Sequence, residues 1–258
     1  MYFTGAEISA LVGTYLWPFF RNAALVSAMP IFNSVFIPIR VRLVIALGIT
    51  FAIAPVIPPV PQVDVLSVDG LMITFNQVVI GIATGFIFNL VIGAFIIAGQ
   101  TVAMQMGLGF ATMVDPSNGS QSPVMSMFFL ILVILFFILL DGHLALIGVL
   151  AKSFYTMPID TVGLVREDFY RIVEWASVMF SGALLVALPA VTALLLVNMA
   201  LGIMGRAAPQ MNIFAVGFSI TIIAGFYVVL VSLPIVLTQF KSLSQSAFSV
   251  AKGVLGVL

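Results

Sequence analysis

The sequence contains no cysteine and a single histidine, His143, among its 258 residues. Without cysteine there are no disulfides, thiolate metal sites or cysteine nucleophiles, and one histidine cannot form a metal site of two histidines. No Gly-x-x-x-x-Gly-Lys-Ser/Thr loop occurs, which excludes ATP hydrolysis by P-loop chemistry. No apolar run contains paired carboxylates, so an intramembrane enzyme would have almost no catalytic groups. We therefore expect a protein that is not an enzyme and that binds no cofactor or metal.

Charged side chains are also scarce. They make up 7% of the residues, against 62% hydrophobic residues, and the mean hydropathy is +1.28. Soluble domains carry about a quarter charged residues, so this composition indicates an integral membrane protein in contact with lipid. The nine basic and nine acidic side chains balance, and nothing suggests a nucleic-acid partner. The first positive charge is Arg21, so we expect no cleaved signal peptide.

About six apolar segments predict an all-α fold. They span residues of about 6–29, 43–57, 71–103, 124–140, 175–203 and 213–237. The third is too long for one membrane span of roughly twenty residues, and prolines interrupt three segments at Pro18, Pro189 and Pro234. Neither orientation places the basic residues on one side of the membrane. We therefore expect kinked helical hairpins held by partner subunits rather than a regular six-helix bundle.

Single positions inside these segments carry further expectations. Arg21 lies deep in the first segment, where it either faces protein or water or extends toward the membrane surface. Gly81 and Gly85 form a Gly-xxx-Gly pair, which permits close contact between two helices. Asp141 and His143 follow the most aliphatic run and form either a proton-handling pair or, as we favour, a capped helix end.

The stretch 104–123 separates two long apolar runs and has the sequence Met-Gln-Met-Gly-Leu-Gly-Phe-Ala-Thr-Met-Val-Asp-Pro-Ser-Asn-Gly-Ser-Gln-Ser-Pro. Gly107 and Gly109 weaken a helix there, and Pro116 moves Asp115 out of the helical region. In a bilayer, irregular backbone persists only where protein or a water-filled cavity satisfies its polar groups. We expect a loop that lines or closes a path between membrane helices. An ordinary connecting loop in water is the alternative.

A second Gly- and Met-rich interruption spans residues 199–212 and has the sequence Met-Ala-Leu-Gly-Ile-Met-Gly-Arg-Ala-Ala-Pro-Gln-Met-Asn. It echoes the stretch 104–123 too weakly to be a repeat. Paired interruptions of apolar segments nevertheless indicate a functional path through a membrane protein.

Two motifs resemble the flagellar biosynthesis protein FliR family, which includes related subunits of virulence type III secretion systems. The first motif runs from Gln105 through Asp115 and Pro116. The second is Arg206-Ala-Ala-Pro-Gln-Met-Asn-Ile-Phe-Ala-Val-Gly-Phe, an unusual sequence for a hydrophobic protein. Length, apolar runs, few soluble loops and motif order agree as well, so the resemblance covers residues 1–258 as a single membrane-embedded subunit.

The resemblance implies a core subunit of the flagellar type III protein export gate, located in the bacterial inner membrane at the flagellar basal body. Such a subunit forms part of a gated conduit for unfolded export substrates. The resemblance also implies hairpins that assemble with FliP-like and FliQ-like subunits into a helical, cone-shaped gate, with an FlhB-like subunit on the cytoplasmic side. A virulence injectisome subunit and a small-solute secondary transporter with broken helices are the alternatives. The transporter needs convergent polar groups, for which Arg21, Asp141 and Asn198 are the candidates.

The resemblance further implies that residues 106–122, here called the central loop, act as a plug in the closed channel. Phe110 and Met113 suit a water-excluding constriction, and the glycines allow the loop to change conformation. The expected plug residues are Met106, Gly107, Gly109, Phe110, Met113, Asp115 and Pro116. The expected subunit-interface residues in the second motif are Arg206, Pro209, Met211, Asn212 and Phe214. Arg206 either pairs with a carboxylate of a neighbouring subunit or anchors the chain at the membrane interface.

Overall fold

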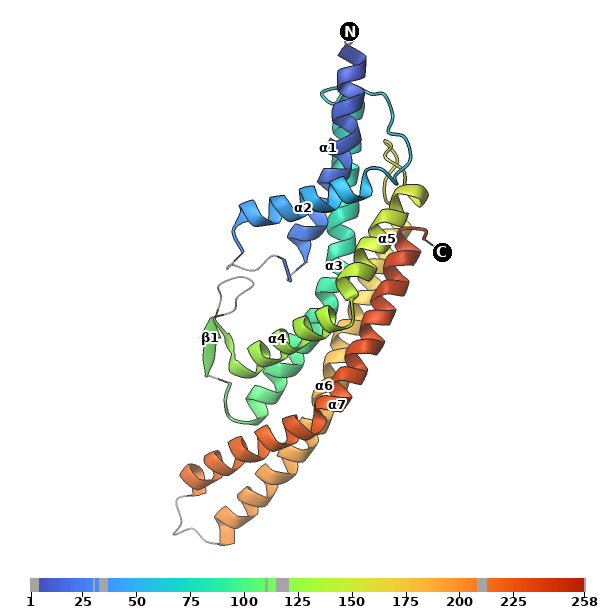
Figure 1. The fold of residues 1–258 in the computed structure, drawn as a ribbon. Helices are drawn as coiled ribbons and strands as arrows, with labels where there is room; N and C mark the ends of the chain where they lie inside the picture. Colours follow the sequence, from blue (N-terminus) through green and yellow to red (C-terminus); the bar gives the residue numbers. More distant parts are fainter. Residues whose placement is uncertain are drawn as a thin grey trace.

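The computed structural model describes residues 5–29, 31–32, 37–109, 111–114, 121–207 and 213–257. These residues form an elongated molecule of helices with two short strands (Figure 1). The elements are α1 (Gly5–Ala28), α2 (Ile39–Ile53), α3 (Val68–Gln105), β1 (Thr112–Val114), β2 (Gln121–Pro123), α4 (Val124–Leu139), α5 (Gly142–Thr156), α6 (Arg166–Ala207) and α7 (Ile213–Val254). The expected helical membrane fold is confirmed, apart from the two strands of three residues each.

Helix α3 is the scaffold of the molecule. It contacts α1, α4, α6 and α7, and 67% of its most apolar window is buried, against 28% in α6 and in α7. Ser67 caps its N-terminus by accepting a hydrogen bond from the Gly70 backbone N–H at 3.1 Å. The apolar character of α3 therefore serves contact with the other helices more than contact with lipid.

Among the described residues, fewer than six helices are both long and apolar enough to cross a membrane. By length and composition, the described residues contain three candidate spans, α3, α6 and the part Gly217–Val254 of α7. A fourth arises if α4 and α5, bent by 65° at a short break, count as one broken span. Helix α2 has 15 residues, which is too short for a span, and it crosses beside α1 (Figure 1). In the described part of the chain, this agrees with the expectation that the apolar segments do not form a regular six-helix bundle.

The break between α4 and α5 falls at Asp141, whose φ is 53°. Asp141 is the N-cap of α5, and its carbonyl oxygen accepts the backbone N–H groups of Leu144 and Ala145 at 3.0 Å. Asp141 therefore lies at a helix end, as favoured, but its side chain makes no capping hydrogen bond. The left-handed backbone conformation turns the chain, so the apolar run of α4 does not continue straight into α5.

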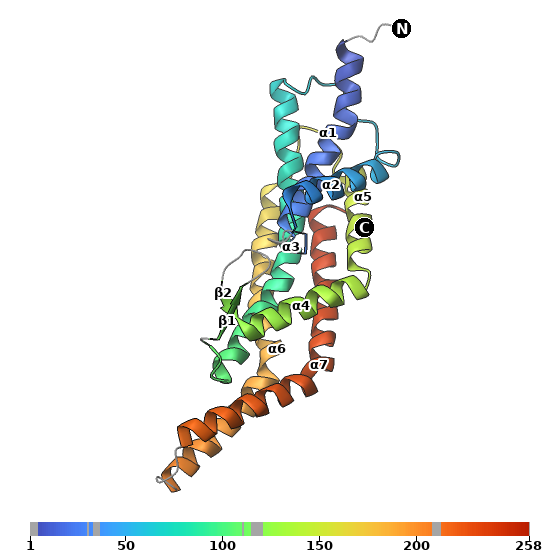
Figure 2. The same cartoon turned by 60° about the vertical axis from the view of Figure 1, so that its left-hand side comes forward.

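Helices α6 and α7 form a long hairpin that changes direction along its length, and each contains an internal proline, Pro189 and Pro234 respectively (Figures 1 and 2). Residues 239–254, which follow the last apolar run, continue α7 instead of forming a separate tail. They remain helical because Leu243, Ala247 and Ala251, spaced four residues apart, are buried on one face.

A buried arginine joins three helices. The guanidinium of Arg21 in α1 donates to Gln77 Oε1 in α3 at 2.8 Å, to Ser153 Oγ in α5 at 2.9 Å and to the Met157 carbonyl oxygen at 2.9 Å. It also lies over the ring of Phe154, 4.1 Å from the centroid. Arg21 is fully buried, so it faces protein and does not extend to the membrane surface.

The Gly-xxx-Gly pair of α3 lies directly against α1, as expected. A Cβ added at Gly81 would overlap the backbone carbonyl oxygen of Arg21, and one at Gly85 would lie 2.5 Å from the Cβ of Ala28. The two glycines therefore allow the helix backbones to approach closely. This approach brings Arg21 within hydrogen-bonding distance of Gln77, one turn before Gly81 on α3.

We predict that Gly81→Ala destabilises the protein by about 1–3 kcal/mol, because the added methyl group has no room against the α1 backbone. Gly48→Ala in α2 is the matched control, since nothing lies within 4 Å of its added Cβ. Thermal unfolding of both variants, purified in detergent, checks the prediction. Equal melting temperatures would show that the α1–α3 contact does not depend on Gly81.

We also predict that Arg21→Lys lowers the free energy of unfolding by about 2–3 kcal/mol, because an ammonium group keeps the charge but loses the planar fork that reaches three acceptors. Arg40→Lys, at an exposed position in α2, is the control. Denaturation of the two purified variants gives the comparison. The prediction fails if Arg21→Lys is as stable as Arg40→Lys.

Candidate functional site

The central loop starts where α3 ends and leads into α4. Met106 is the C-cap of α3, and the antiparallel strands β1 and β2 pair with Met113 opposite Ser122. The sequence prediction of an irregular loop missed this hairpin. Its signal was the β-branched pair Thr112 and Val114, followed by a turn-forming Asn-Gly dipeptide. The expected plug residues Phe110, Asp115 and Pro116 lie outside the described residues.

Met106 holds the base of the central loop inside the protein. Its side chain is fully buried and lies over Gly225 of α7, where an added Cβ would be 2.6 Å from Met106 Cγ. The absence of a side chain at Gly225 therefore makes the space that Met106 fills. Gly107 follows with a φ of +75°, and a Cβ there would lie 3.2 Å from the ring of Phe218 in α7.

The same end of α3 is hydrogen-bonded to the long hairpin. Asn198 Nδ2 in α6 donates to the carbonyl oxygen of Gln105 at 3.3 Å. The hydroxyl of Thr221 in α7 lies 3.1 Å from Asn198 Oδ1 and 2.8 Å from the carbonyl oxygen of Gly217, so its one proton serves two acceptors. Asn198 therefore joins the last turn of α3 to both α6 and α7.

Beyond its base, the central loop exposes methionine. Met113 in β1 is 49% exposed, in contrast to the buried Met106. Gly109 lies beside the exposed Met104, since an added Cβ would be 2.5 Å from Met104 Sδ. Among the expected plug residues that the structure describes, Met106 is therefore buried and Met113 is exposed.

The second motif lies elsewhere. The end of α6 and the start of α7 form the far tip of the hairpin, whereas β1 and β2 lie beside α3 and α4 (Figures 1 and 2). Arg206 is exposed in the last turn of α6, where a cation complements the helix dipole. Pro209, Met211, Asn212 and the side chain of Phe214 lie outside the described part of the chain. The two interruptions are therefore not brought together into one site by the described residues.

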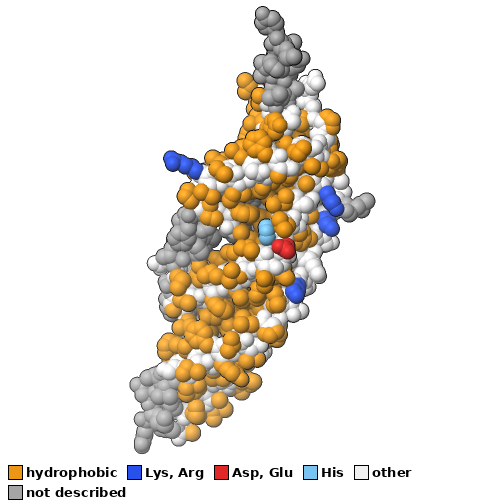
Figure 3. Space-filling view, viewed as in Figure 1, with side chains coloured by type: hydrophobic (Ala, Val, Ile, Leu, Met, Phe, Trp, Pro, Cys, Tyr) orange, Lys and Arg blue, Asp and Glu red, His pale blue; other side chains and the backbone are white. Residues whose placement is uncertain are grey.

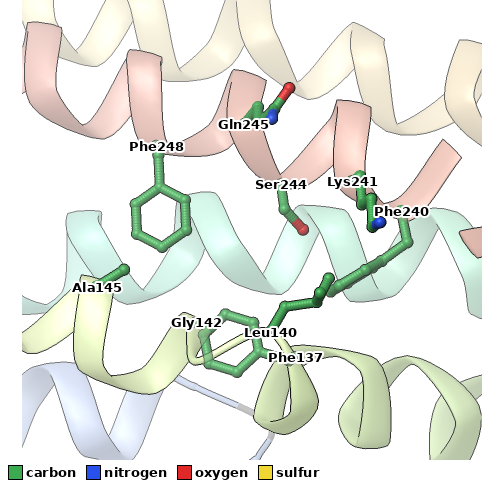
Figure 4. A pocket seen from close by; sticks show the side chains of 9 residues that line it. All are labelled: Phe137, Leu140, Gly142, Ala145, Phe240, Lys241, Ser244, Gln245 and Phe248. Carbon is green, nitrogen blue, oxygen red and sulfur yellow. The ribbon is translucent and has the colours of Figure 1, made fainter. Parts of the chain in front are cut away.

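A pocket of about 300 Å³ opens at the break between α4 and α5 (Figure 4). Its walls are mainly aromatic and aliphatic, and Lys241 and Ser244 of α7 add polar groups. No acidic side chain is among the nine residues that line it, namely Phe137, Leu140, Gly142, Ala145, Phe240, Lys241, Ser244, Gln245 and Phe248. The pocket therefore holds no acid–base pair for catalysis.

The polar candidates for a transporter site do not converge. Arg21 bonds to groups of α3, α5 and Met157, whereas Asn198 bonds to the end of α3 and to Thr221. Asp141 is exposed at the break before α5. Among the described residues, these three side chains share no hydrogen-bond partner.

These features define a class of protein, namely a helical membrane protein. Its most buried helix, α3, ends in a loop that begins at the buried Met106 and exposes Met113. Residues 12–247 match the model of a family described as bacterial export proteins, family 1. The flagellar biosynthetic protein FliR of Pectobacterium carotovorum is 37% identical over 95% of this chain and 93% of its own length.

FliR of Escherichia coli K12 is also 37% identical, over 99% of this chain and 97% of its own. FliR of Bacillus subtilis is 26% identical over 98% of both chains. The chain therefore belongs to the FliR family of flagellar biosynthetic proteins, and the resemblance seen in the two motifs extends over nearly the full length.

Proposed function

We propose that this chain is a core subunit of the flagellar protein export gate, in which the central loop closes the conduit for unfolded export substrates. Membership of an export protein family makes it a component of the flagellar export apparatus. The observation that carries the finer proposal is the division of the central loop. Met106 is buried over Gly225, while Met113 in β1 is exposed.

A plug needs a fixed base and an adaptable tip. The base of the central loop is fixed by burial of Met106 and by the left-handed turn at Gly107. Strand β1 carries the exposed Met113, and methionine side chains adapt to irregular surfaces because they are unbranched and flexible. Apolar side chains at a constriction exclude water, and with it ions. Residues 106–122 therefore have the side chains that closing a conduit to water and ions requires.

The outer surfaces favour assembly with other subunits. In α6 and α7 only 28% of the most apolar window is buried, and large side chains such as Leu188, Leu196, Ile223 and Tyr227 are exposed. Hydrophobic side chains also cover most of the face in Figure 3, with few charged groups among them. Lipid or protein must cover this surface. We assign it to lipid and to FliP-like and FliQ-like subunits in a cone-shaped gate, with an FlhB-like subunit on the cytoplasmic side.

The remaining assignments follow from the same proposal. Residues 1–258 act as one membrane-embedded subunit in the bacterial inner membrane, at the flagellar basal body. The interruption 199–212 contacts a neighbouring subunit, and the exposed Arg206 at the hairpin tip pairs with a carboxylate there. The flagellar system is favoured over an injectisome because the relatives are named as flagellar proteins.

Deletion of residues 109–118 in the native host tests the sealing role. We expect the inner membrane to leak ions and motility to fall, because the tip that fills the constriction is lost while the buried base at Met106 remains. Ion leakage is measured together with copurification of the other gate subunits. A strain that lacks the whole chain is the control, since it assembles no gate and should not leak. If the truncated chain assembles and permeability is unchanged, the loop is a connector and not a seal.

A further inference from the structure

The base of the central loop is attached to the long hairpin at two points. The Gln105 carbonyl oxygen accepts a hydrogen bond from Asn198 in α6, and Met106 fills the space over Gly225 in α7. Both views of the fold show the lower end of α3 beside α6 and α7 (Figures 1 and 2). We call Gln105, Met106, Asn198, Thr221 and Gly225 the latch.

The latch connects the end of α3 to the α6–α7 hairpin through side-chain contacts. Asn198 is half-buried in an apolar region, where an amide without partners would be costly, and both its amide atoms have partners across helix boundaries. Thr221, which is buried, orients the Asn198 carbonyl group from the opposite helix. The position of this amide therefore depends on how α6 lies against α7.

The loop cannot change its path at the base while the latch is intact. Gly107, next to Met106, has a left-handed backbone conformation and lies against Phe218 of α7. A shift of α7 along α3 would move Phe218 and remove the space at Gly225 in the same step. A movement of the hairpin is thereby transmitted to the first residues of the loop.

We propose that Asn198 is a positioning residue that holds the central loop in its closed path, and that movement of the α6–α7 hairpin opens the gate by breaking the latch. This inference rests on the sealing role proposed for residues 106–122. It assigns to the hairpin a function beyond contact with neighbouring subunits, namely control of the loop from the side opposite β1 and β2.

The first test compares Asn198→Leu and Thr221→Val with Thr238→Val in the assembled gate. Thr238 lies on the same helix as Thr221, is exposed, and donates its hydroxyl to the Pro234 carbonyl oxygen of its own helix. We expect ion leakage to rise about three- to tenfold in the two latch variants, since one hydrogen bond changes an equilibrium constant by about that factor. Thr238→Val should not leak. Thr221→Val is nearly isosteric, so it tests the latch even if Asn198→Leu fails to assemble.

The results separate the latch from the sealing role. If the deletion of 109–118 leaks and both assembled latch variants do not, the latch is wrong and the sealing role stands. If Thr238→Val leaks as much as Thr221→Val, the effect is not specific and the latch is again wrong. If the deletion itself does not leak, the sealing role fails.

A reversible crosslink provides the second test, which is possible because the chain has no cysteine. A cysteine Sγ at position 106 would occupy the place of Met106 Cγ, and that atom lies 2.6 Å from a Cβ at position 225. In a disulfide, Sγ lies about 3 Å from the partner's Cβ, so the bond can form after a shift of a few tenths of an ångström. In a Thr221→Val background, Met106→Cys with Gly225→Cys should bring leakage back to the wild-type level on oxidation, and a reductant should raise it again. Unchanged leakage after the disulfide has formed would overturn the latch, and each single cysteine variant is the control.

Discussion

The guanidinium of Arg21 is the interaction on which the upper half of the molecule depends. Its acceptors come from α3, from α5 and from the chain just after α5, and all of them are neutral. Removing a cation from water costs several kcal/mol, which these bonds offset only if every acceptor is in place. Gln77 gives its carbonyl oxygen to Arg21 and leaves its own Nε2 buried without a hydrogen-bond partner among the described residues. Arg21 thus dictates the orientation of its neighbours.

The hydrogen bonds of Arg21 fix the position of α3 against α1. The position of α3 in turn determines where its C-terminal end, at Gln105, lies. Gly81 and Gly85 hold α3 close to α1, and Gly99 holds it close to the start of α4, where an added Cβ would lie 2.7 Å from the Ser126 Cα. With α3 fixed along this length, its last turn at Gln105 has one available position beside α6 and α7. The central loop is therefore presented by a rigid helix and not by a flexible connection.

Local sequence signals predicted the elements whose cause is local. The sequence predicted the close helix contact at Gly81 and Gly85, because a missing side chain shortens the distance between helices at its own position. It also predicted the end of α3 near Gly107, because a glycine allows a positive φ at its own position. The expectation that the apolar segments do not form a regular six-helix bundle agrees with the three or four candidate spans of the described residues. Hydropathy did not show that α7 continues beyond residue 238, because the residues that follow are amphipathic. The buried state of Met106 was not predictable, because it depends on Gly225, more than a hundred residues away in the chain.

The hydrogen bonds of Arg21 and those of Asn198 differ in how much free energy is needed to break them. Separating Arg21 from its acceptors would leave a full charge inside the protein, which is prohibitive, so the joint of α1, α3 and α5 is permanent. Separating Asn198 from Gln105 and Thr221 leaves only neutral groups, each of which finds water or another carbonyl at a modest cost. In the proposed gate, which must stay assembled while the central loop moves, the contact made by a buried charge is the one that stays closed. The contact made by the Asn198 amide is the one that opens.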